Sequence, residues 1–280
     1  MQDPWQQHVT GAPPHAGSAS TIPTYARSVS AMDAIKFAFS TPDWTMNLLL
    51  GLVFMMIPVV GPLALQGWHA EIHQRLARRH PQPIPKLDFA DFMHYLERGI
   101  GPFVVNLALM FPLFIVVYVF MFIAGFASVG IGRATNEPGL VMVVAAASSL
   151  VAAALIFFCS VLVNAAMTRV ELTEAIGPSL SPGPMFSYGK RIWSKFFVAT
   201  LAYGFLAMGL LLLGMLLLCV GLYPATVAVQ LGSLHLRWQL YEYQLAQGGE
   251  SIPLKAPVML PSEARMHQAY PQQPYPPQGY

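Results

Sequence analysis

Histidine and carboxylate side chains at helical spacing are the residues of this chain best suited to chemistry. His69 and His73 stand four residues apart, and His94 precedes Glu97 by three. Imidazoles one helical turn apart can share a metal ion such as Zn²⁺. Glu71 falls between the first two histidines, so the sequence lacks the His-Glu-x-x-His pattern of metalloproteases, and histidines on a polar helix ordinarily face water. We therefore expect no metal site, no cofactor and no catalytic residue, and keep the three histidines as the candidates for metal binding.

A basic cluster follows in the same polar stretch and consists of Arg75, Arg78 and Arg79. At a membrane surface, such a cluster attracts anionic lipid by about 1 kcal/mol for each charge. It also helps to fix which side of a membrane the segment occupies. The two roles are compatible, and we expect these three arginines to contact lipid head groups.

The composition indicates that the chain lies in a membrane, which this expectation requires. Hydrophobic residues make up 55% of the chain and charged residues only 10%, whereas a soluble domain has about 25% charged residues. Four long runs lack Asp, Glu, Lys and Arg, at residues 44–70, 99–132, 138–168 and 196–236. A membrane-spanning helix needs about 20 apolar residues. The sequence therefore predicts an all-α, multi-pass integral membrane protein, and the net charge of +2 argues against nucleic acid as a partner.

The first and last runs are interrupted by helix-breaking residues. Pro58, Gly61 and Pro62 divide the first run, and only about 21 Å of helix precede the break, less than the ~30 Å core of a bilayer. The last run breaks near residues 221–224. We interpret both as hairpins that flank two ordinary spans, at 100–126 and 139–168, which gives about six membrane helices.

Amphipathic and disordered segments complete the predicted organisation. Residues 28–41 and 88–98 carry apolar side chains on one helical face, which is typical of helices lying in the membrane interface. The composition predicts three parts: a disordered tail at 1–26, a helical membrane domain at 28–255, and a Pro-, Gln- and Tyr-rich disordered tail at 256–280.

The distribution of basic residues predicts the orientation. If the first and last runs are hairpins, every Lys and Arg except Arg133 lies on one side, fourteen of the fifteen. By the positive-inside rule that side is cytoplasmic and holds both termini. Four tryptophans at the edges of the hairpins are expected to anchor them at the interface: Trp44, Trp68, Trp193 and Trp238.

Polar and small residues within the spans indicate helix contacts. Asn106 and Asn164 lie inside apolar runs, where an amide ordinarily hydrogen-bonds to a neighbouring helix. A face of small residues on the 139–168 span permits close packing and consists of Ala145, Ser149, Ala152 and Ala153. Whether its partner is another helix of this chain or a second copy stays open.

Two stretches resemble a known family. They read DWTMNLLLGLVFMMIPVVGPLALQGWHAEIHQRLAR and PIPKLDFADFMHYLERGIGPF, and they are similar to the bacterial and archaeal membrane family called domain of unknown function 4013. The matching residues are Asp43, Trp44, Gly51, Ile57, Pro58, Gly61, Pro62, Gly67, Trp68, Glu71 and Arg75. Trp68 stands where that family more often has Tyr. The resemblance implies a prokaryotic cytoplasmic-membrane protein and no assigned activity.

These observations favour a non-enzymatic scaffold or accessory subunit of the cytoplasmic membrane. The alternative is a component of a transporter or channel, which the broken helices support and the scarcity of charges inside the spans weakens. The third hypothesis is a membrane-bound enzyme that uses the three histidines. The expected partners are the lipid bilayer, including anionic lipids, and either a second copy of the chain or another membrane protein.

Overall fold

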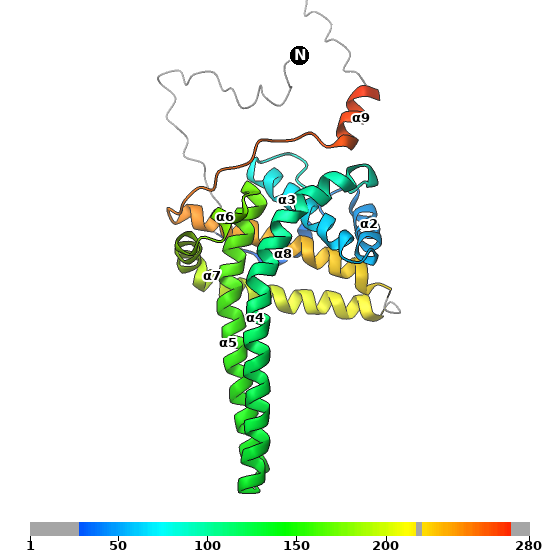
Figure 1. The fold of residues 1–280 in the computed structure, drawn as a ribbon. Helices are drawn as coiled ribbons and strands as arrows, with labels where there is room; N and C mark the ends of the chain where they lie inside the picture. Colours follow the sequence, from blue (N-terminus) through cyan, green and yellow to red (C-terminus); the bar gives the residue numbers. More distant parts are fainter. Residues whose placement is uncertain (1–27, 217–219, 270–280) are drawn as a thin grey trace, which may run out of the picture.

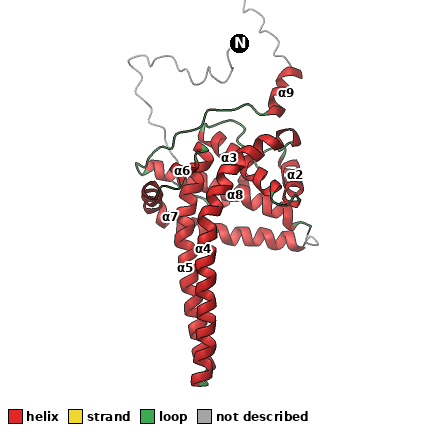
Figure 2. Ribbon diagram, viewed as in Figure 1, coloured by secondary structure: helices red, strands yellow, loops and turns green. Residues whose placement is uncertain are grey.

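Helices dominate the computed structural model, which describes residues 28–216 and 220–269. Within these residues the chain forms helices and no strand (Figure 2). The helices are α1 (Ala31–Phe37), α2 (Trp44–Met56), α3 (Val60–Ala77), the short 3₁₀ helix η2 (Phe89–Asp91), α4 (Phe92–Thr135), α5 (Pro138–Thr173), α6 (Ile176–Ser179), α7 (Pro182–Leu216), α8 (Leu222–Ala246) and α9 (Pro261–Ala269). The predicted tail at 1–26 lies outside the described residues.

The break predicted in the first apolar run separates α2 from α3. Val59 takes a positive φ of 63° between the two helices. A Cβ added to Gly61 would lie 1.7 Å from the carbonyl oxygen of Phe54, so only glycine allows the chain to turn back this tightly. Pro62 falls in the first turn of α3, where its missing N–H costs nothing. A second break, before α8, occurs where the sequence predicts it, near residue 221.

α4 and α5 form an antiparallel pair that projects far from the other helices (Figure 1). We call residues 110–155 the arm and the remaining described residues the body. α4 supplies about 39 Å of helix to the arm and α5 about 27 Å at 1.5 Å per residue, close to a bilayer core. Large apolar side chains are exposed along the arm, for example Phe114 at 68% and Met142 at 72%.

The helix predicted separately at 88–98 is instead formed by η2 and the first turns of α4, so its predicted separation from the following span is wrong. The chain runs helically through Gly99 and Pro102 without a break, and Figure 1 shows α4 curving from the body into the arm. Prolines inside a helix are a common cause of such bends. Of the predicted small-residue face in the arm, Ala152 is buried, whereas Ala145, Ser149 and Ala153 are exposed.

α7 runs across the direction of the arm and closes the side of the body from which the arm emerges (Figure 1). One of its faces packs on the body through residues three or four positions apart, among them Phe196, Tyr203 and Ala207. The opposite face is apolar and exposed, with Val198 and Phe205 both at 64%. By length and composition, three described helices could cross a membrane: Phe89–Thr135, Pro138–Thr173 and Pro182–Leu216. Six membrane helices are not confirmed.

The first and last described helices, α1 and α9, pack on other helices of the body. α1, within the stretch predicted to lie in the interface, buries Ala34 and Phe37 against α8, and the Phe37 ring stacks on His235 with centroids 4.4 Å apart. Leu260, before α9, is 1% exposed, and the Ser262 hydroxyl donates to an Asp91 carboxylate oxygen at 2.6 Å. The disordered tail predicted from residue 256 therefore begins too early, because an apolar anchor and polar contacts fix residues 260–263.

The body is assembled around a close crossing of α3 and α4. A Cβ added to Gly67 would lie 1.8 Å from the carbonyl oxygen of Tyr95, and one added to Gly99 would lie 1.9 Å from that of Leu63. The two backbones therefore touch where both helices present glycine, as in close-packed membrane helices. Trp68, adjacent to the crossing, is fully buried and donates its indole N–H to the Pro85 carbonyl oxygen at 3.2 Å.

Replacing Gly67 with Ala is expected to lower the free energy of unfolding by about 3 kcal/mol or more, because the new methyl group overlaps a backbone carbonyl that cannot move alone. Gly125→Ala in the arm is the matched control, since a Cβ there meets nothing within 4 Å. It should be neutral or stabilise by up to about 1 kcal/mol. Thermal unfolding midpoints of both variants in detergent measure the difference, and equal midpoints would contradict the crossing.

Candidate functional site

Charged side chains lie inside the body, along the half of α3 that follows Gly67. Glu71, His73, Gln74 and Arg75 are all buried, because α2, α4, α5 and α8 surround this helix. Buried charges are costly unless they are paired and hydrogen-bonded. Their partners come from four other parts of the chain.

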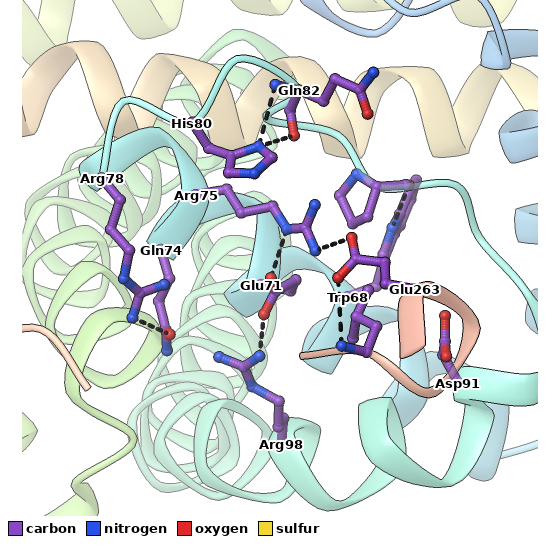
Figure 3. Close-up of polar contacts among 12 residues, drawn as sticks. Trp68, Glu71, Gln74, Arg75, Arg78, His80, Gln82, Asp91, Arg98 and Glu263 are labelled. Carbon is purple, nitrogen blue, oxygen red and sulfur yellow. Dashed lines mark hydrogen bonds and ion pairs between the residues drawn. The ribbon is translucent and has the colours of Figure 1, made fainter. Parts of the chain in front are cut away.

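Glu71 lies between two arginines (Figure 3). One carboxylate oxygen accepts a hydrogen bond from Arg75 Nε at 2.5 Å, and the other accepts from Arg98 Nη1 of α4. Glu71 is 4% exposed and Arg98 is 7% exposed. These contacts link α3 to α4 one helical turn beyond the glycine crossing.

Each of these arginines binds a second carboxylate. Arg98 Nε donates to Glu174, just after α5, at 2.7 Å, and Arg75 Nη2 donates to Glu263 of α9 at 2.7 Å. Lys255 pairs with the other oxygen of Glu174. Three carboxylates and three cations thus form one electrically balanced network, which ties α3, α4, the end of α5 and the C-terminal segment together.

The network keeps Glu71 and Glu174 ionised by lowering the pKa of each carboxyl group. Burial alone would raise the pKa of Glu71, but Arg98 and Arg75 outweigh it and hold that pKa below its ordinary value of 4.5. The same opposition acts on Glu174, whose pKa is lowered chiefly by Lys255 and Arg98 against the effect of burial. Both side chains therefore act as charged acceptors rather than as proton donors at neutral pH.

A second group of buried charged side chains lies on the other side of α3. Glu171 of α5 is 1% exposed and binds His73 Nδ1 at 2.6 Å and Arg237 of α8 at 2.9 Å. The Trp238 ring meets the His73 imidazole edge-on. This cluster, formed by Glu171, His73 and Arg237, joins three helices that are far apart in the sequence.

The three candidate histidines are placed in three different environments. His73 binds Glu171, His69 faces a cavity, and His94 lies on α4 beside the Tyr95 ring. Among the described residues, no group of three or more His, Cys, Asp and Glu side chains is arranged to hold a metal ion.

The arginines predicted to contact lipid head groups differ from one another. Arg75 is 6% exposed and bound to two carboxylates, so the prediction for this residue is corrected. Arg78 is half-buried and donates to Gln74 and to the Lys255 carbonyl oxygen. Arg79 has a side chain that is 59% exposed and bridges to Glu242 at 2.8 Å. Head-group contact stays a prediction for Arg78 and Arg79.

Two of the four predicted tryptophan anchors are core residues. Trp68 is 0% exposed and Trp238 is 8% exposed, so neither has surface to offer to lipid, and the prediction is corrected for both. Trp44 and Trp193 are 38% and 42% exposed and remain candidates for the interface.

Most partners of the buried charges are not predicted from the sequence: Arg98, Glu174 and Glu263 of the network, and Glu171 and Arg237 of the cluster. One signal was available: Arg98 precedes an apolar run, whereas Glu171 and Glu174 follow one. In an antiparallel pair of helices such residues lie at the same level. Of these three residues only Arg98 contributes to the predicted orientation, which rests on Lys and Arg alone.

An all-helical body with buried ion pairs, joined to long apolar helices, defines a helical protein compatible with a membrane. The chain belongs to the family described as "Protein of unknown function (DUF4013)", whose sequence profile matches residues 50–219, more than half of its length. The resemblance seen in the sequence is therefore confirmed. No curated protein and no solved structure matches the chain.

Glu71→Gln is expected to cost about 3 kcal/mol of stability, because it removes the carboxylate shared by two buried guanidinium groups. Glu250→Gln is the control, since Glu250 is 61% exposed in its pair with Arg169 and such pairs contribute less than about 1 kcal/mol. Urea unfolding at neutral pH measures both.

The pH dependence of the same variants gives a second readout. A carboxyl group with a depressed folded-state pKa stabilises the fold above its unfolded pKa, and the stabilisation is lost as pH falls through the folded value. Wild type should therefore lose stability as the pH falls below about 4.5, and Glu71→Gln should lose less over that window. Parallel curves for the two proteins would show that Glu71 is not held ionised.

Proposed function

We propose that this protein is a non-enzymatic scaffold or accessory subunit of the cytoplasmic membrane. The arm crosses the bilayer and the body lies at its cytoplasmic face, with α7, on the side of the body that faces the arm, resting in the membrane interface. The exposed sides of the arm offer the contact surface to a second copy or to another membrane protein.

The surface of the arm supports its place in the bilayer. Between residues 110 and 155 the only Asp, Glu, Lys or Arg residues are Arg133 and Glu137, both at the tip. Soluble proteins rarely expose apolar patches beyond a few hundred Å², whereas the arm exposes large apolar side chains along both helices. All other described Lys and Arg residues belong to the body, which is the distribution of a protein with a cytoplasmic body.

The exposed stripe on α7 supports its in-plane position. Val198, Phe205 and Leu212 are spaced by seven residues and are each more than half exposed, so they lie along one face of the helix. Because α7 runs across the arm (Figure 1), a bilayer crossed by the arm would meet this face along its length.

The observation that carries the scaffold proposal is the pairing of the buried charges with one another. Glu71, Arg75, Arg98 and Glu263 join α3, α4 and α9 into one unit (Figure 3). Arg98 belongs to the same helix as the arm, so the network fixes the arm to the body. Such an arrangement suits a rigid platform that holds its partners in position.

The transporter alternative is supported by a cavity of about 420 Å³ between helices of the body. Within the arm it has less support. A polar path across the bilayer needs polar side chains along it, and one hairpin with apolar residues on its outer faces supplies none, so several copies would be required.

A photo-crosslinking amino acid tests the scaffold proposal. Placed at Ser149 or Ala153, on the exposed small-residue face, it should give a discrete protein adduct in native membranes because small residues allow a partner helix to approach closely. The same probe at Phe122, which is 56% exposed on α4, is the control and should give mainly lipid adducts. Lipid adducts alone at all three positions would contradict the proposal.

Spin labels test the position of α7. Cysteines at Val198, Phe205 and Leu212, in a chain whose Cys159 and Cys219 are replaced with Ala, should report nearly equal depths in a bilayer by collision with oxygen. Ile115, Phe122 and Val129 of α4 share the seven-residue spacing, are exposed, and should give graded depths, since α4 crosses the bilayer. A gradient along α7 matching that of α4 would show that α7 spans the membrane.

A further inference from the structure

A cavity of about 420 Å³ lies in the body beside the Glu171 cluster. α3, α5, α7 and α8 form its walls, and α2 and α4 contribute one residue each. A space of this volume is typical of small-molecule sites and holds far more than a single water molecule.

Four residues that line the cavity each carry a buried polar atom with no hydrogen-bond partner within the described protein. These atoms are Gln66 Oε1, His69 Nε2, Asn164 Oδ1 and Arg237 Nε. His69 and Asn164 are each only 8% exposed. Buried polar groups are nearly always hydrogen-bonded, and an atom left without a partner destabilises the fold. Four of them around one space therefore indicate a site for a ligand rich in hydrogen-bonding groups.

The charges at the cavity are already balanced. Glu171 is the carboxylate in its lining, and it is held by Arg237 at 2.9 Å and by His73 at 2.6 Å. His69 is neutral at pH 7 because burial lowers its pKa to about 4. Because Glu171 and Arg237 already neutralise each other, a charged ligand would gain little compensation for its desolvation cost.

The remaining lining is partly polar and partly apolar. Ser160, Thr200 and Ser233 add hydroxyl groups, whereas Leu65 and Phe196 add apolar surface. Hydroxyl groups both donate and accept, which fits the mixture of amide oxygens, imidazole and guanidinium N–H. Sugar rings present hydroxyl groups at their edges and C–H groups on their faces, and so match both sides.

We infer that this cavity binds an uncharged, hydroxyl-rich molecule of the sugar or polyol class. Gln66, His69, Asn164 and Arg237 provide the hydrogen bonds, and Leu65 and Phe196 contact the C–H face. The ligand chemistry is shared by free sugars and by the head groups of neutral glycolipids. The inference does not depend on the scaffold proposal.

Binding to the full chain, purified in a detergent without a sugar head group, tests the inference. The first experiment measures binding of radiolabelled glucose by equilibrium dialysis, with glucose 6-phosphate as the charged counterpart. The second experiment measures retention of monoglucosyldiacylglycerol from phosphatidylcholine nanodiscs by native mass spectrometry, with phosphatidylglycerol as the charged counterpart. Saturable binding of glucose assigns a free sugar, and binding of the glycolipid alone assigns a head group.

His69→Leu and Asn164→Leu should each weaken this binding by about tenfold or more, since each removes a hydrogen bond in a buried site. His94→Leu is the matched control, because His94 also has a buried Nε2 without a partner in the described protein but lies outside the cavity. Circular dichroism and size-exclusion chromatography check that all three variants fold. The inference is overturned if neither uncharged probe binds, if the charged counterparts bind equally well, or if the two cavity variants bind like wild type.

Discussion

The fold depends on the contact between the backbones of α3 and α4 at Gly67 and Gly99. Each glycine lies where a Cβ would collide with a carbonyl oxygen of the other helix. This approach places Glu71 and Arg98 close enough to bind, and it buries Trp68 and Tyr95 completely. Since α4 continues into the arm without a break, the crossing also sets the direction in which the arm leaves the body.

The buried ion pairs become favourable only because the crossing assembles them all at once. A single buried charge would cost several kcal/mol, but Glu71, Arg98 and Glu174 share partners, so each hydrogen bond relieves two groups. The geometry requires α4, the end of α5 and the C-terminal segment to be present together. Such a network favours one arrangement of helices over others that bury the same apolar area. It also holds α9, through the pair between Arg75 and Glu263.

Local signals in the sequence predicted local features, and the features they missed are tertiary. Pro58 and Gly61 act within one turn of chain, so the break between α2 and α3 could be predicted from them. The exposed surface of the arm follows from the length of two uncharged runs. The burial of Arg75, Trp68 and Trp238 could not be predicted, because an amphipathic side chain at the end of an apolar run has the same sequence context whether it meets lipid or another helix. Gly67 and Gly99 posed the same difficulty, since a glycine in an apolar run gives no sign of which helix will pack against it.

The length and composition of α7 also do not decide between a helix that spans the membrane and one that lies in its plane. The burial pattern separates two faces of this helix: Phe196, Thr200 and Tyr203 line the cavity, whereas Val198 and Phe205 point away from the body. In the proposed arrangement α7 is the wall between the cavity and the lipid. A head group entering from the bilayer would pass beside this helix, whereas a free sugar would enter from the cytoplasmic side. The depth of α7 and the identity of the ligand are therefore linked. If α7 lies in the plane of the membrane, both routes are open. If α7 spans the membrane, the cavity lies within the bilayer, where only a membrane-borne ligand has ready access.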